Sequence, residues 1–342
     1  MAKKMKYGIG VRTQYPADAD MSVAFAEQME QARVADALGY DILMKSSHLA
    51  GYPLQEFQQL PYLGRVMAEA PNMRLLTGVT LLSLHKPLDM AEQLASIDVM
   101  SGGRLTFGCG LGYREVEFKG FGTTQKDRVP RFEENLEAIK RLWTEDEVSM
   151  VGSHFELDKT RLSLKPLQKP MPPIWIGANA DAAIVRAAKM ADAWFINPHQ
   201  RMDTIEKQID VYKRALDEAG KPFPDEVPAA REVFVANSRD EAIRLAKPYL
   251  EAKYKIYHQW GQDKAMPEGD NDLDLAYEEL LEDRFILGSP DEVAEQVIAH
   301  GNRLGVNVLI LGFHWVGMPQ SLVLENLTRF KEDVMPKVEQ GL

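Results

Sequence analysis

The chain alternates short apolar runs with amphipathic helical segments eight times, and this alternation constrains its fold more than any other feature. Runs that are apolar throughout are typical of parallel strands whose two faces are both covered. Eight strand–helix units in 342 residues predict an α/β fold, the (β/α)8 TIM barrel, as a single domain over 1–342. The expected strands are 7–12, 40–44, 75–82, 105–109, 174–177, 193–196, 232–236 and 306–311.

An open, doubly wound sheet is the alternative to a barrel. That fold would need a glycine-rich nucleotide fingerprint directly after the first strand, and residues 9–14 do not contain one. The barrel is therefore the favoured prediction. Its expected helices are 21–38, 54–70, 87–100, 131–143, 180–190, 204–219, 240–255, 289–305 and 321–334.

Two stretches fall outside the repeat and are expected to be insertions. Residues 145–166 alternate weakly around Gly152 and Ser153, which predicts a β-hairpin. Residues 256–285 contain the acidic segment 262–274, whose few apolar side chains predict a mobile loop. Such a loop at a barrel mouth is a candidate lid, and the alternative is a solvated excursion without a catalytic role.

Charge and cysteine usage restrict the class of protein. The net charge of −11 argues against nucleic acid and anionic membranes as partners, and no apolar run is long enough to cross a bilayer. The charged opening at residues 1–6 is followed by an apolar run too short for a signal peptide. Because a single cysteine cannot form an intrachain disulfide, we expect a cytoplasmic protein.

In a (β/α)8 barrel the functional residues are expected where strands end, because such barrels build their sites from the loops after the strands. These strand ends carry Arg12, 45–48, 82–85, 110–113, 177–179, 197–199, Asn237 and 312–315. Tyr113, Phe313, Trp315 and Met318 favour an apolar organic substrate, although aromatic residues at a barrel mouth are as often part of the packing.

The strand at 105–109 runs directly into a glycine-rich turn. Gly110, Leu111, Gly112 and Tyr113 form this turn. Because glycine has no Cβ, the backbone here can approach a ligand closely, which predicts a binding site. A tight strand-to-helix connection without a ligand explains the same segment.

A histidine, His48, follows the second expected strand. Histidine exchanges a proton near neutral pH, so this position predicts a catalytic role, the alternative being a structural histidine. His85, His199 and His314 also lie at strand ends and could shape a pocket. No two histidines have metal-ligand spacing and no cysteine cluster accompanies them, so we expect no metal site, the alternative being one assembled from residues distant in sequence.

A second turn leads from the fifth expected strand into a helix through Gly177, Ala178, Asn179 and Ala180. The free N–H groups and dipole of a helix start favour an anionic group such as a phosphate. Capping of the helix by Asn179 is the alternative. The carboxylate of Asp181 would repel a phosphate unless it points away.

Together these segments resemble the bacterial luciferase-like superfamily of flavin- or coenzyme F420-dependent oxidoreductases. The resemblance covers nearly the whole chain, and its most specific parts are DVMSGGRLTFG at 98–108 with FKGFG at 118–122, RFEENL at 131–136, PPIWIGA at 172–178 and RFILGSP at 284–290. It implies a (β/α)8 barrel, commonly dimeric, with the flavin or deazaflavin ring at the carboxyl-terminal mouth.

The resemblance also implies roles for individual residues. His48 matches the active-site histidine, and the acidic residue that many F420-dependent members place before it is Ser47 here. Gly78 and Val79 match the position of a non-prolyl cis peptide behind the ring. The implied cofactor-binding residues are Gly78, Val79, Thr80, Gly110, Leu111, Gly112, Tyr113, Gly177, Ala178, Asn179 and Ala180.

Two departures from the light-emitting members stand in the fourth strand and its turn. Gly110 occupies the position of their reactive cysteine, with Cys109 one residue earlier and on the opposite face, and Leu111 replaces their phosphate-binding arginine. We therefore expect no light emission.

The expected activity is that of a two-component monooxygenase that uses O2 and reduced FMN (FMNH2) from a separate flavin reductase to oxidise a small organic substrate. The alternative within the family is coenzyme F420-dependent hydride transfer. From other classes, a non-catalytic flavin-binding barrel is disfavoured by His48, and a metal-assisted hydrolase by the scattered histidines. The resemblance further implies a homodimer.

Overall fold

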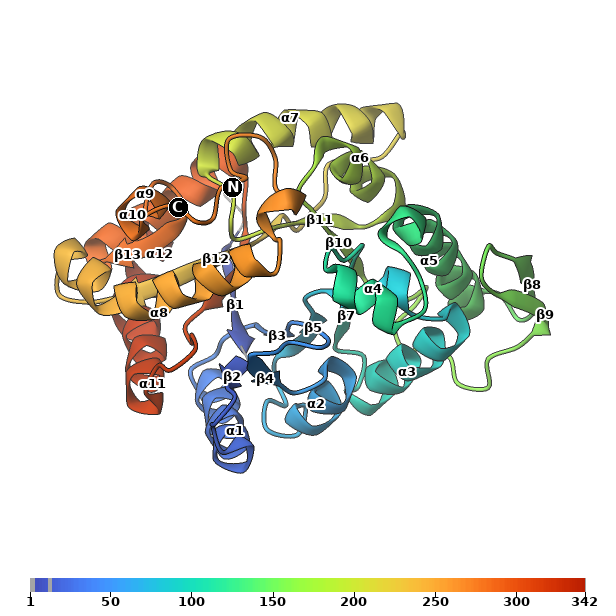
Figure 1. Ribbon diagram of the computed structural model, residues 1–342, viewed down its shortest axis with the longest axis horizontal. Helices are drawn as coiled ribbons and strands as arrows, with labels where there is room; N and C mark the ends of the chain where they lie inside the picture. Colours follow the sequence, from blue (N-terminus) through green and yellow to red (C-terminus); the bar gives the residue numbers. More distant parts are fainter. Residues whose placement is uncertain (1–3, 12–13, 342) are drawn as a thin grey trace.

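The computed structural model describes residues 4–11 and 14–341, and its parallel strands close into a barrel surrounded by helices (Figure 1). The strand β1 pairs with β14 on one side and β3 on the other, and pairing of β7 with β10 closes the ring. The predicted (β/α)8 barrel is confirmed. Its wall consists of β1 (Lys6–Val11), β3 (Ile42–Lys45), β5 (Arg74–Thr77), β7 (Leu105–Gly110), β10 (Ile174–Ala178), β11 (Ala193–Ile196), β12 (Pro228–Val235) and β14 (Val308–Gly312).

The wall strands are mostly apolar, as strands with both faces buried require. In β3, Ile42 and Met44 join an apolar cluster that fills the barrel interior together with Trp175 and Phe195. The alternate residue Leu43 belongs to the larger cluster between the strands and the surrounding helices. The period of two along a strand thus separates one core inside the barrel from a second core outside it.

The outer layer follows the expected helices closely. Asp20 caps the first helix, and Ser289 forms a capping box with Glu292 at the start of α10. Gly305 ends α10 in the left-handed conformation, with φ of 69°, as a glycine there predicts. The long helices are α1 (Met21–Ala37), α2 (Gln59–Val66), α3 (Pro87–Met100), α5 (Arg128–Thr144), α6 (Asp181–Met190), α7 (Met202–Glu218), α8 (Arg239–Gln259), α10 (Pro290–Leu304) and α11 (Gln320–Arg329).

Shorter elements connect these parts. A π-helical turn, Phe330–Val334, joins α11 to α12 (Met335–Gly341). The others are α4 (Glu115–Gly120), α9 (Tyr277–Leu280) and the 3-10 turns Leu82–Leu84, Gln125–Asp127 and Asp263–Ala265. None of the helices in the described part of the chain combines the length and apolar character that crossing a membrane would require.

Two local predictions were wrong, and one strand was not predicted. The expected helix 54–70 begins as a strand, β4 (Leu54–Glu56), because these residues pair with β2 (Gln14–Pro16). The expected strand 75–82 is interrupted at Gly78 and Val79, after which β6 (Thr80–Leu81) pairs with the end of β7. A further strand, β13 (Phe285–Gly288), extends along the second half of β12. In each case the tertiary pairing partner decided the conformation.

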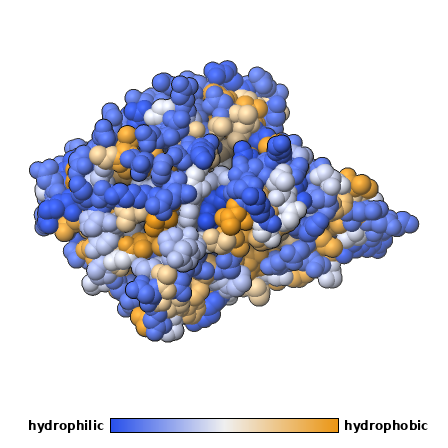
Figure 2. Space-filling view, viewed as in Figure 1, coloured by the Kyte–Doolittle hydropathy of each residue, from blue (hydrophilic) through white to orange (hydrophobic). Residues whose placement is uncertain are grey.

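The two stretches outside the repeat lie in different places. Strands β8 (Val148–Val151) and β9 (Glu156–Thr160) form an antiparallel hairpin that projects from the side of the molecule in Figures 1 and 2. The other stretch continues α8, which lies in front of β12 in Figure 1 and bonds to it through Lys253 and Glu232. The acidic segment therefore begins at the mouth of the barrel.

Candidate active site

A cavity of about 340 Å³ opens at the carboxyl ends of the barrel strands. The lining includes both polar and apolar residues, and residues of both kinds lie side by side in the middle of the face seen in Figure 2. All predicted site residues except Thr80 line this cavity, namely His48, Gly78, Val79, Gly110, Leu111, Gly112, Tyr113, Gly177, Ala178, Asn179 and Ala180. Thr80 is buried and its hydroxyl donates to Gln59 Oε1 at 2.7 Å, behind the wall.

The cavity also has walls that the motifs did not indicate. Ser46, Ser47, Asn197 and His199 lie at strand ends, where we expected functional residues in general. Arg128, Tyr257, Gln262, Lys264, Ala265 and Met266 come from helices and the segment after α8. These residues could not be predicted from the ends of strands, because only the path of the chain over the mouth brings them to the cavity. Val11, Met44, Leu81, Ala183, Phe195, Pro198 and Ala230 complete the lining.

His48 lies in an aromatic enclosure on one side of the cavity. Its ring centre is 5.1 Å from that of Trp260, 5.8 Å from Tyr257 and 6.1 Å from Tyr113. The side chain is 11% exposed. Three aromatic contacts restrict the tilt of the imidazole, so the ring is held in place before any ligand binds.

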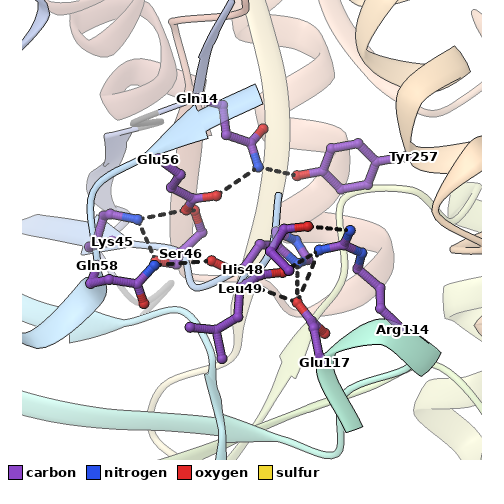
Figure 3. A network of polar contacts seen from close by, with 11 residues as sticks. Gln14, Lys45, Ser46, His48, Leu49, Glu56, Gln58, Arg114, Glu117 and Tyr257 are labelled. Atoms are coloured by element: carbon purple, nitrogen blue, oxygen red, sulfur yellow. Dashed lines mark hydrogen bonds and ion pairs between the residues drawn. The ribbon is translucent and has the colours of Figure 1, made fainter. Parts of the chain in front are cut away.

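A buried carboxylate, Glu117, faces the imidazole from α4. Glu117 Oε1 lies 3.4 Å from Nδ1 of His48 and accepts hydrogen bonds from the Leu49 N–H at 3.0 Å and from Arg114 Nη1 at 3.3 Å (Figure 3). The guanidinium of Arg114 also stacks on Trp260, with 4.1 Å from Cζ to the ring centre. These contacts connect the loop that carries His48 to α4 and to the end of α8.

A second buried carboxylate, Glu56, lies on the other side of the same loop. It pairs with Lys45 Nζ at 2.7 Å and accepts from Gln14 Nε2 at 3.2 Å (Figure 3). Burial opposes its ionisation, but Lys45 and then His48 attract the carboxylate and lower the pKa of Glu56 below its ordinary value. Burial also lowers the pKa of Lys45, against the attraction of Glu56. The buried ion pair of Lys45 with Glu56 thus also supports the loop that carries His48.

Val79 forms part of the cavity wall between two glycines. The Gly78–Val79 peptide bond is cis, as the family resemblance implied. A Cβ on Gly110 would lie 2.9 Å from Val79 Cγ2, and one on Gly177 would lie 3.1 Å from Cγ1. Larger residues at either glycine would therefore displace Val79. The glycines leave a smooth wall against which a flat ligand can lie.

The start of α6, which follows Gly177 of this wall, has no side-chain cap. Ala180 is the N-cap residue, and Asn179 donates instead to the carbonyl oxygen of Ala265 at 3.2 Å, so the alternative of capping by Asn179 is wrong. Asp181 Oδ1 accepts from Gln208 Nε2 at 3.3 Å, on the side of α7, and does not line the cavity. The helix start is therefore available to an anionic group.

Two cationic side chains line the same cavity, Arg128 and Lys264. Among the described lining residues no aspartate or glutamate accompanies them. The cavity thus concentrates positive charge in a chain whose net charge is −11. This distribution suits a ligand with an acidic group.

The acidic segment after α8 covers part of the mouth and is better anchored than its composition suggested. Asp270 is fully buried, accepts from Arg201 Nε at 3.0 Å and pairs with Arg284 Nη2 at 3.1 Å. Met266 and Leu273 are also buried. The segment thus buries a carboxylate and two apolar side chains that its composition did not suggest, and its mobility stays a prediction.

Several other candidate residues lie away from the cavity. His85 packs against Phe121 and His314 against Tyr15, so of the three additional histidines His199 alone lines the cavity among the described residues. Phe313, Trp315 and Met318 are buried in the core and do not shape the described lining, contrary to the expectation.

Cys109 is buried on the outer face of β7, as expected, and burial raises the pKa of its thiol. Arg12 lies outside the described residues. Within the described part of the chain, no three His, Cys, Asp or Glu side chains come together as a metal-binding group.

The fold and the site resemble those of flavin- or F420-dependent barrel enzymes, and comparison with known proteins gives the family. The sequence profile of the luciferase-like monooxygenase family matches residues 5–307. The chain belongs to the luciferase-like monooxygenase family. It is an enzyme of that oxidoreductase group.

Individual relatives fall into two cofactor groups. The chain is 26% identical over 299 residues to an FMNH2-dependent dimethylsulfone monooxygenase from Pseudomonas putida, covering 82% of this chain and 81% of the relative. It is 24% identical over 320 residues to an F420-dependent glucose-6-phosphate dehydrogenase from Amycolatopsis mediterranei, covering 91% and 93%. Among solved structures, the monooxygenase RslO1 from Streptomyces bottropensis superimposes with a TM-score of 0.81 at 24% identity, covering 97% and 99%.

Proposed function

We propose that this protein is a monooxygenase that uses reduced FMN and O2 to oxidise a small organic molecule. The observation that supports this most is the combination in one cavity of a smooth glycine wall, an uncapped helix start with two cations, and His48. These three parts correspond to what a phosphorylated flavin needs: a surface for its ring, a partner for its phosphate and a proton-exchanging group nearby.

The residues present fit FMN. The ring would lie against Val79 between Gly110 and Gly177. A side chain at either glycine would displace Val79, so the two glycines keep this wall in place. The phosphate would bind at the start of α6, with Arg128 and Lys264 providing charge. Arg128 and Lys264 would take over the role of the arginine that Leu111 replaces. When bound, reduced flavin supplies the electrons that activate O2.

His48 would move the proton. Its Nδ1 faces Glu117, which leaves Nε2 as the ring nitrogen for the cavity. An imidazole nitrogen that donates and accepts near neutral pH can protonate a developing charge at the substrate or cofactor and recover the proton afterwards. Tyr257, Trp260 and the cover formed by residues 262–266 would limit the access of water.

Coenzyme F420 is the second candidate cofactor, since the relatives include F420-dependent glucose-6-phosphate dehydrogenases. Ser47 favours FMN. It lines the cavity directly before His48, at the position where many F420-dependent members carry an acidic residue. Sequence identity does not distinguish the two cofactors, because an F420-dependent relative and the FMNH2-dependent relative are both 26% identical to the chain.

The proposal carries expectations about partners. A monooxygenase of this type would receive reduced FMN from a separate flavin reductase. The mouth leaves room for a small substrate of mainly apolar character, since Met44, Phe195, Tyr257 and Met266 contribute to its lining. We further propose a homodimer in the cytoplasm.

Anaerobic titrations would test the assignment. Reduced FMN, oxidised FMN and reduced F420 are added in parallel, and binding is followed by fluorescence of the protein. We expect reduced FMN to bind more tightly than oxidised FMN, because the enzyme must capture the reduced form from its reductase. Aeration in the presence of a panel of small sulfones, ketones and alkanes should then give an oxygenated product containing ¹⁸O from ¹⁸O2. Tight F420 binding with negligible affinity for FMN would contradict the proposal.

A further inference from the structure

We propose that Glu117 is a positioning residue that fixes the tautomer of His48, with the proton on Nδ1 and the lone pair of Nε2 toward the cavity. The consequence for turnover rests on the proposed function. The tautomer itself does not, because it is a property of the protein without ligands. The argument uses the donors around Glu117, the loop that carries His48, and the other charged groups near the ring.

The donors around Glu117 determine which ring nitrogen carries the proton. The Leu49 N–H and the Arg114 guanidinium can only donate, so Glu117 Oε1, which bonds to both, is an acceptor. An accepting oxygen 3.4 Å from Nδ1 requires the proton to be on Nδ1. In the neutral ring Nε2 then has a lone pair and can act as a base. Sharing one oxygen among three donors explains why the Nδ1 contact is long.

Arg114 fixes the backbone that carries the imidazole. Its Nη1 donates to the Leu49 carbonyl oxygen at 2.7 Å and its Nη2 to that of Ala50 at 3.1 Å. Ala50 has a φ of +49°, a left-handed conformation that needs support in a residue other than glycine. Because Glu117 binds the Leu49 N–H and Arg114 binds the carbonyl groups, both edges of the loop after His48 are held by the same buried pair.

The other described groups near His48 are less suited than Glu117 to fix its tautomer. Glu56 attracts the imidazole from β4, but its oxygens are bonded to Lys45, Gln14 and Ser46. Tyr113 and Tyr257 meet the ring nearly edge-on, with interplanar angles of 79° and 87°, and Trp260 is tilted by 55°. The side chain of Glu117 is fully buried, so water does not compete with it as the partner of Nδ1.

The tautomer can be measured directly. Protein with ¹⁵N-labelled histidine is studied by long-range ¹H–¹⁵N NMR without cofactor, and His48 is assigned by the loss of its signals in the His48→Gln variant. At a pH where the imidazole is neutral, we expect a protonated, pyrrole-type Nδ1 and an unprotonated, pyridine-type Nε2. A wild-type His48 with its proton on Nε2 would overturn the proposal.

Two substitutions at Glu117 separate positioning from a merely structural role. Glu117→Leu removes the acceptor, so the population with the proton on Nε2 should rise. Glu117→Gln retains an oxygen that can accept from Leu49 and Arg114, so Nδ1 should stay protonated. Glu115→Gln is the matched control, since Glu115 lies on the same helix with 53% of its side chain exposed. An unchanged tautomer in folded Glu117→Leu would refute the assignment, and if that variant does not fold, a proton on Nε2 in Glu117→Gln would do so.

Turnover provides a second measurement once an oxidised substrate is identified. We expect Glu117→Leu to lower kcat by about 10-fold or more with little change in KM, and Glu117→Gln to recover most of the loss. Combined with His48→Gln, Glu117→Leu should add little further loss, because both remove the same function. If the fold-loss in kcat of the double variant equals the product of the losses in the two single variants, Glu117 acts independently of His48. The NMR result stands whatever the enzyme oxidises.

Discussion

The His48 side of the cavity and the α6 side are built on different physical principles. His48 is surrounded by bonded side chains, with Glu117, Arg114 and three aromatic rings fixing its position. The α6 side offers an uncapped helix start and the cations Arg128 and Lys264. Proton transfer needs a group fixed to a fraction of an ångström, whereas an anion can be bound by charge and backbone N–H groups with looser geometry. On the proposed function, proton transfer and cofactor binding would therefore be supported on separate sides of this cavity.

The acidic segment 262–274, which covers part of the mouth, gives the largest expected effect. Asp270→Ala would leave Arg284, which is nearly fully buried, without its carboxylate. Loss of one partner of a buried pair costs about 3–5 kcal/mol of unfolding free energy. Chemical denaturation should show this loss, and Glu268→Gln, a change at an exposed residue of the same segment, should leave the midpoint unchanged. An Asp270→Ala variant as stable as the wild type would mean that the cover is not anchored by this residue.

The His48 side is tested next. His48→Gln keeps a hydrogen-bonding side chain but cannot exchange a proton near neutral pH, so kcat should fall by about 10²-fold or more. The affinity for reduced FMN should change little, because retention is assigned to the α6 side. Steady-state turnover and an anaerobic titration measure the two quantities. Comparable losses in both would remove the proposed separation of the two sides.

The glycine wall between the two sides should give a smaller effect. A Cβ on Gly110 would lie 2.9 Å from Val79, so Gly110→Ala should displace Val79 and weaken FMN binding by about 10-fold, or about 1.4 kcal/mol. The double variant Gly110→Ala with Val79→Ala removes the conflict and should recover part of the affinity. Failure of this rescue would locate the effect of Gly110 elsewhere than in its contact with Val79.

The smallest effect is expected from single cations on the α6 side. Lys264→Gln and Arg128→Gln should each weaken FMN binding several-fold while leaving riboflavin binding unchanged, because riboflavin lacks the phosphate. Lys126→Gln provides the control, since Lys126 is exposed and absent from the described lining. Equal losses for FMN and riboflavin would show that the two cations do not recognise the phosphate.

Much of this site follows from strand ends. Gly110, Gly177 and His48 could be predicted because each lies at or shortly after the end of an apolar run, and parallel strands in a barrel end at one rim. Thr80 came from the family resemblance and does not line the cavity, because it is buried in β6 and its hydroxyl donates to Gln59.

Other parts had no local signal. Glu117 and Arg114 look like ordinary helix residues, and their burial against His48 depends on where α4 lies relative to the loop after β3. The order of the acidic segment depends on Arg284, which forms a pair with Asp270 across 14 positions of sequence. Composition alone predicted a mobile loop because it does not show which partner a carboxylate will find.

The sequence by itself determined the barrel, the rim that carries the site, and the residue types available at each strand end. These follow from hydrophobic periodicity and from backbone freedom at glycine, which are local properties. Only the tertiary structure decided which walls close the cavity, because α8 brings Tyr257 and Trp260 over the mouth and the following segment adds Lys264. It also decided the donors and acceptors around His48. Hydrogen bonds between residues such as His48 and Glu117, 69 positions apart, are set by packing of the whole barrel rather than by any local pattern.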